Sequence, residues 1–120
     1  NPDAINAQIN FAELYTKQGR FEEAEISFGK VIDFYPVKEY VIRYAYIQIA
    51  LHNPDGAIDI INKYFDDGLG NSDLNAPLGT AYFVKGDYKQ AIFFLKKSVE
   101  LGSTTPELKE MIKISEQQLP

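Results

Sequence analysis

Several residue types that carry protein chemistry are absent or scarce in this chain of 120 residues. Cysteine is absent, which excludes disulfides, thiolate nucleophiles and cysteine-based zinc sites but does not fix the compartment. Histidine occurs once, as His52, at a predicted turn between helices, and we interpret it as a turn residue. No apolar run approaches the ~20 residues that a membrane-spanning helix needs. We therefore expect a soluble protein, with the cytoplasm favoured over the periplasm, and no membrane insertion.

Positive charge is also scarce. The chain has 12 Lys and Arg against 17 Asp and Glu, which gives a net charge of −5 at pH 7, and its basic residues form no cluster. Proteins that bind nucleic acid or an anionic membrane use basic patches to attract phosphate groups. We therefore expect neither of these partners.

A short pattern recurs along the chain with a period of about 34 residues. Residues 19–24 read Gly-Arg-Phe-Glu-Glu-Ala and residues 86–91 read Gly-Asp-Tyr-Lys-Gln-Ala, while a weaker copy at residues 52–57 keeps only the alanine. Such a period is typical of stacked helix–turn–helix units.

Glycine, proline and capping residues divide the chain into seven predicted helices. They cover about 1–18, 21–34, 37–51, 54–65, a fifth that begins between 71 and 75 and ends near 85, 88–101 and 105–118. Asn1 and Asn53 are predicted N-caps, and Asp73 or Asn75 should cap the fifth helix so that Pro77 falls in its first turn. Either Thr104 or Thr105 should cap the seventh helix.

The repeated segments resemble the tetratricopeptide repeat family. The first copy has Phe-Ala-Glu-Leu-Tyr at 11–15 and then Gly19, Phe21, Ala24, Phe28 and Pro36; the third has Leu-Gly-Thr-Ala-Tyr at 78–82 and then Gly86, Tyr88, Ala91 and Leu95. The middle copy is degenerate, with Gln48 in place of the tyrosine and Pro54 in place of the turn aromatic. The resemblance implies one all-α domain over 1–120, a right-handed α-solenoid of three repeats (about 5–37, 38–71 and 72–105) plus a C-terminal capping helix over about 105–118.

The seventh helix departs from the pattern, because Lys113 and Glu116 stand where a small residue and a tyrosine would allow a partner helix to approach. We interpret it as a terminal cap with one solvent-facing side, with a truncated fourth repeat as the alternative. Because repeat arrays are easily divided between units, we expect the chain to be a piece of a longer protein.

The first helix of each pair lines the concave side in this family, where peptides or partner helices commonly bind. The third helix carries a second apolar stripe, Ile42, Tyr46 and Ile49, and a helix with two apolar faces is either buried on both or available to a ligand. The predicted partner-binding residues are Ile9, Glu13, Ile42, Arg43, Tyr46, Ile49, Thr80 and Phe83. The alternative is that this stripe packs within the superhelix or against a neighbouring domain.

We predict a non-catalytic scaffold that binds a peptide or a partner helix in an apolar groove. The alternative is an assembly module that stacks on further repeats or on another copy as a homo-oligomer. The carboxylate clamp of chaperone-tail receptors is not expected, because only Arg43 among the corresponding positions could hold a carboxylate. No catalytic arrangement, cofactor motif or metal-ligand spacing is visible, and the acidic loop 66–71 lacks the spacing of a calcium loop.

Overall fold

The computed structural model describes residues 2–66 and 72–120, and within these ranges the chain is helical and contains no strand. The elements are α1 (Pro2–Lys17), α2 (Phe21–Phe34), α3 (Lys38–Ala50), α4 (Pro54–Phe65), the 3₁₀ turn η2 (Ser72–Leu74), α5 (Asn75–Lys85), α6 (Tyr88–Glu100) and α7 (Pro106–Gln118). Seven α-helices were predicted, and their positions are confirmed to within one or two residues at most ends. The chain is an all-α solenoid.

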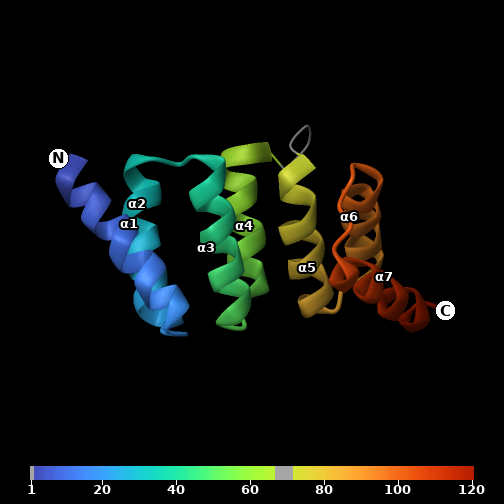
Figure 1. Cartoon of the computed structure of the whole chain (residues 1–120). Coiled ribbons are helices and arrows are strands. Elements are labelled where there is room, and N and C mark those ends of the chain that lie inside the picture. Colours follow the sequence, from blue (N-terminus) through green and yellow to red (C-terminus); the bar gives the residue numbers. More distant parts are fainter. Residues whose placement is uncertain (1, 67–71) are drawn as a thin grey trace.

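The helix pairs stand side by side in one row, with the two termini at opposite ends (Figure 1). Each α-helix packs on the next one along the chain, so that α1 with α2, α3 with α4 and α5 with α6 form successive pairs and α7 closes the row. The first helices of neighbouring pairs also meet, α3 with α5 and α5 with α7. The molecule is accordingly elongated, with extents of 51 × 28 × 24 Å.

Small residues lie where the helices of a pair approach closely, as the repeat pattern predicts. The fully buried alanines are Ala12, Ala24, Ala45, Ala57, Ala81 and Ala91. Gly79 takes the same role in the third pair, because a Cβ placed there would lie 2.6 Å from Cγ of Leu95 and 3.0 Å from its backbone nitrogen. A methyl group at this position would force the two helices apart.

The turn within each pair has the same backbone hydrogen bonds in all three repeats. In the first turn the amide of Gly19 donates to the carbonyl of Thr16, and the amide of Arg20 donates to that of Tyr15. Gly19 and Gly86 adopt positive φ angles of 73° and 89° at this turn. His52 holds the same place in the middle repeat with a φ of 61°, so its interpretation as a turn residue fits the backbone.

The middle repeat replaces its missing aromatic and glycine with a small polar network. Gln48 is buried, and its Oε1 accepts from Nδ2 of Asn53 at 2.9 Å. Oδ1 of Asn53 accepts from the amide of Gly56 at 3.1 Å, so the predicted N-cap is confirmed. A side chain on Gly56 would collide with both polar groups, which explains a glycine in the first turn of α4.

The predicted cap of α5 is wrong. The N-cap of α5 is Leu74, not Asp73 or Asn75, because η2 precedes the helix and carries the fully buried Leu74 into the core. Pro77 does fall in the first turn of α5. Thr105 takes the N-cap position of α7 without a capping hydrogen bond from its side chain. The predicted cap Asn1 lies outside the described residues, as do residues 67–71 of the acidic loop.

The seventh helix closes the row with a polar outer side. Leu108 and Ser115 are buried, and Leu108 packs with Ala91 and Leu95 of α6. Lys113 and Glu116 are exposed, and Glu116 lies 3.4 Å from Nζ of Lys96. A polar outer side is what a capping helix needs to keep the end of a solenoid in water.

In the described part of the chain, no helix is both long enough and apolar enough to cross a membrane.

Candidate functional site

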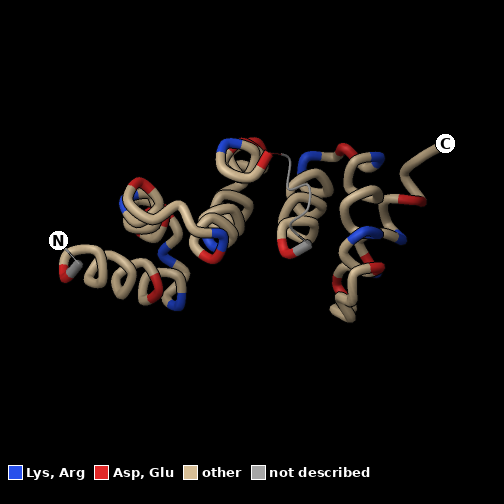
Figure 2. The backbone as a smooth tube through the Cα atoms, turned by 90° about the horizontal axis from the view of Figure 1, so that it is seen from above, with Lys and Arg blue, Asp and Glu red and all other residues tan. Residues whose placement is uncertain are grey.

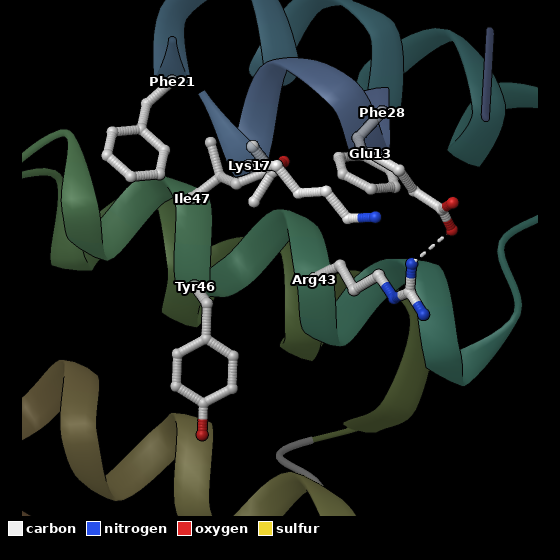
Figure 3. Close-up of a pocket in the computed structure, with 8 residues that line it drawn as sticks. Glu13, Lys17, Phe21, Phe28, Arg43, Tyr46 and Ile47 are labelled. Carbon is white, nitrogen blue, oxygen red and sulfur yellow. Dashed lines mark hydrogen bonds and ion pairs between the residues drawn. The ribbon is translucent and has the colours of Figure 1, made fainter. Parts of the chain in front are cut away.

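A pocket of about 520 Å³ opens between α1 and α3, with α2 behind it (Figure 3). It is lined by Glu13, Thr16, Lys17, Phe21, Phe28, Arg43, Tyr46 and Ile47. Helical spacing explains the set, because residues three, four or seven positions apart share one face of a helix. Each of the three helices therefore turns a single face toward the pocket.

The floor of the pocket is apolar and closed. Phe28 and Ile47 are 1% and 3% exposed, and both belong to one buried cluster with Ala12 and Ala24. The half-buried ring of Phe21 packs against the same cluster and forms one wall. A ligand side chain that enters the pocket would therefore meet hydrocarbon and aromatic surface.

The rim of the pocket is charged. Nη1 of Arg43 lies 2.6 Å from Oε1 of Glu13 on α1, and Nη2 lies 3.0 Å from Oε1 of Glu39 on α3 (Figure 3 shows the first pair). These side chains are exposed, so each pair contributes at most about 1 kcal/mol, but together they fix the position of the guanidinium. Lys17 forms no ion pair with any residue that the structure describes, so its ammonium is available to an acidic group.

Tyr46 occupies the far side of the pocket and reaches toward α5 (Figure 3). Its hydroxyl hydrogen-bonds to the side chain of Thr80, and the hydroxyl of Thr80 also donates to the carbonyl of Ala76 at 2.7 Å. Burial raises the pKa of Tyr46 above its ordinary value of 10.0, against the opposing effect of the Thr80 hydrogen bond. Tyr46 is therefore neutral at physiological pH and joins the second repeat to the third.

Three of the predicted site residues, Glu13, Arg43 and Tyr46, line this pocket, and Thr80 contacts it through Tyr46. Ile9 lies away from it, in a smaller hollow of about 230 Å³ beside Tyr35 and Tyr40.

The other apolar residues of the predicted groove lie elsewhere. Ile42 and Ile49 are half-buried and pack against the central core cluster. Phe83 packs against the C-terminal cluster and lies edge-on to Tyr88, with ring centroids 6.0 Å apart. The second apolar stripe of α3 is thus largely taken up by packing, and the predicted residues do not form one continuous floor.

The sequence analysis named Phe21 and Phe28 only as residues of the repeat pattern, and it did not assign Lys17 or Ile47 to the site. A usable signal was present, because Lys17 is four residues from Glu13 and Ile47 is four residues from Arg43. The pattern could not show that α1 and α3 stand apart here. This separation leaves Phe21 and Phe28 within reach of a ligand.

The structure is that of a helical-repeat protein. Its helices form successive antiparallel pairs with buried small residues, its turns are of the glycine type, and its last helix is polar. The family model described as tetratricopeptide repeat matches residues 5–38 and 75–102, just over half of the sequence, and the chain belongs to this family. The stretch between the two matches holds the degenerate middle repeat.

Solved structures agree on the fold. The first tetratricopeptide domain of the human RPAP3 protein, determined by NMR, has a TM-score of 0.81 at 19% identity, covering 98% of this chain and 93% of that one. The crystal structure of the P58(IPK) tetratricopeptide domain has a TM-score of 0.78 at 21% identity, covering 96% of this chain and 33% of that one. No curated protein matches the sequence. Members of the family are generally non-catalytic modules that bind protein partners, and in this general sense the chain is a protein–protein interaction scaffold.

Proposed function

We propose that this chain binds a segment of a partner protein by anchoring an apolar side chain in the pocket between α1 and α3. The observation that carries the proposal is the pocket itself, with an apolar floor of Phe28 and Ile47 and a charged rim. Its volume of about 520 Å³ lies within the usual range of ligand pockets.

The rim indicates what should flank the anchor. Arg43 is already held by two carboxylates, whereas Lys17 has no ion-pair partner among the described residues. A partner segment that carries an acidic residue next to its apolar anchor would satisfy both features. Burial of one anchor contributes roughly 1.5–3 kcal/mol, and association and ordering costs offset much of it, so the interaction should be micromolar and transient.

Filling the pocket tests the proposal without removing a core side chain. Thr16 is exposed and lines the pocket, so Thr16→Trp should occupy the space that a ligand would use. Peptides selected from a random displayed library with the wild-type chain should bind Thr16→Trp at least tenfold more weakly by calorimetric titration. Gln90→Trp, on the exposed side of α6, is the matched control and should bind them normally. Equal binding by Thr16→Trp would exclude the pocket as the site.

Assembly through one end of the row is a second candidate function. The two ends differ, because α1 exposes Phe11 and Leu14, each 49% exposed, whereas the outer side of α7 carries Lys113 and Glu116. This difference favours association through the N-terminal end over end-to-end stacking of copies. The face of α1 that would be used is not the one that lines the pocket.

A further inference from the structure

The outer side of α1 carries an uncharged row of side chains that no described helix covers. Ala4, Ala7, Phe11 and Leu14 are spaced three and four residues apart and therefore lie along one side of the helix. Phe11 and Leu14 are each 49% exposed, Ala4 is exposed and Ala7 is half-exposed. α1 stands at the end of the row of helices, so nothing in the described chain lies beyond it (Figures 1 and 2).

The two inner repeats show what normally covers this row. The residues equivalent to Leu14 are Ile47 and Ala81, which are 3% and 0% exposed, and the residue equivalent to Phe11 in α5 is Leu78, 1% exposed. In each case the second helix of the preceding pair provides the cover, α2 for α3 and α4 for α5. The outer side of α1 is the equivalent contact surface, and no helix of the described chain lies over it.

The inner contact also shows which shape the covering helix must have. The residue equivalent to Phe11 in α3 is Tyr44, and a Cβ built on Gly29 of α2 would lie 3.8 Å from Cε2 of that ring. An aromatic ring at this position thus rests on a small residue of the helix that covers it. α1 itself offers small residues, Ala4 and Ala7, next to its own large ones.

The ring of Phe11 is held in place before any partner arrives. It stacks on Tyr15 with ring centroids 6.2 Å apart, and the guanidinium of Arg20 lies 4.8 Å from the centroid of the Tyr15 ring. A side chain that is already ordered loses little conformational entropy on binding. Phe11 is therefore suited to anchor a helix–helix contact.

We propose that a second copy of this chain covers α1, with the two α1 helices antiparallel about a twofold axis that crosses the contact midway between Ala7 and Phe11. In this arrangement Phe11 lies over Ala7 of the second copy and Leu14 over Ala4 of the second copy, so large residues meet small ones along the whole contact. The contact is isologous, because each copy uses the same face of α1, and it therefore closes as a dimer. This inference rests on the assembly candidate above and is independent of the pocket.

The dimer should be weak, because one helix of 16 residues buries less area than a standard protein interface. Light scattering across micromolar to millimolar concentrations should show the mass rising from that of a 13.6 kDa monomer toward twice that value. Phe11→Glu should stay monomeric at every concentration while its far-ultraviolet circular dichroism remains helical. Phe93→Glu, at a ring 52% exposed on α6, should dimerise as the wild type does.

Ala7→Leu gives a second test that adds apolar surface instead of removing it. The equivalent positions in the next two repeats are Tyr40 and Leu74, so the repeat tolerates a large residue there. If Phe11 lies over Ala7 of the second copy, the leucine should weaken dimerisation at least tenfold. Stronger dimerisation would contradict the pairing.

Cysteine cross-linking tests the orientation, since the chain has no cysteine of its own. Asn10→Cys lies near the proposed twofold axis and should form a disulfide dimer on oxidation, whereas Gln117→Cys in α7 should not. A disulfide dimer of Gln18→Cys would show parallel helices and overturn the orientation. A wild type that is monomeric at all concentrations would overturn the assembly candidate together with this inference. A dimer insensitive to Phe11→Glu would overturn only the placement on α1, and none of these results would affect peptide binding in the pocket.

Discussion

The turn of the middle repeat holds His52 in a backbone conformation that favours glycine, and the other two turns have glycine there. The φ angle of His52 is 61°, against 73° for Gly19 and 89° for Gly86. The left-handed conformation costs an L-residue roughly 1–2 kcal/mol, whereas glycine loses roughly 0.5–1 kcal/mol more conformational entropy on folding. The imidazole is exposed, so its removal forfeits little packing. We therefore expect His52→Gly to raise the free energy of unfolding by about 0.5–1 kcal/mol.

Urea unfolding followed by circular dichroism measures this change as a higher midpoint with an unchanged slope. For a chain of this size the same gain raises Tm by roughly 2–4 °C. Gly86→His is the reverse control, because a Cβ there meets no atom within 4 Å and only the backbone term changes. It should lose about what His52→Gly gains. A His52→Gly variant that is equal to or less stable than the wild type would refute the argument from backbone strain.

Two further predictions concern packing and pH. Gly79→Ala should destabilise the chain by roughly 1–3 kcal/mol in calorimetry, because its Cβ would collide with Leu95. Gly29→Ala should stabilise it by about 0.5–1 kcal/mol, since its Cβ meets a single ring atom at 3.8 Å; a gain at Gly79 as well would contradict the close approach of α5 and α6. Because burial raises the pKa of Tyr46 above 10.0, the stability linked to this group is present below pH 10.0 and lost as pH rises through the folded-state pKa. Tyr46→Phe should therefore lose less stability than the wild type in urea titrations above pH 10.0, and an identical alkaline loss would show that folding does not raise the pKa of Tyr46.

The helices were predicted well from the sequence because residues close to each helix end determine where it begins or stops. Gly19 and Pro36 bracket α2, and Asn53 with Pro54 opens α4, so no tertiary information was needed there. The start of α5 was missed for the opposite reason. Its cap position is taken by Leu74, which is fully buried, and this burial depends on the neighbouring helices and not on local capping chemistry.

The repeat register predicts which residues of successive first helices are equivalent, and only this part of the candidate site could be predicted from the sequence. The register puts Glu13 and Tyr46 at equivalent positions of successive first helices, and both line the pocket together with Arg43. It could not show that Ile42 and Ile49 are half-buried against the core, because a single helix with two apolar faces does not reveal which neighbour covers them. That depends on how closely successive pairs approach.

The two junctions between successive first helices differ because one repeat position holds residues of different size and polarity. Glu13, Tyr46 and Thr80 occupy this position in α1, α3 and α5. Between α3 and α5 the long ring of Tyr46 crosses the gap to the hydroxyl of Thr80, and these two helices pack directly together. Between α1 and α3 the carboxylate of Glu13 instead holds Arg43 at the rim, which leaves the space above Phe28 and Ile47 unfilled. A partner side chain in this space would therefore fill the gap between α1 and α3, as Tyr46 fills the gap between α3 and α5.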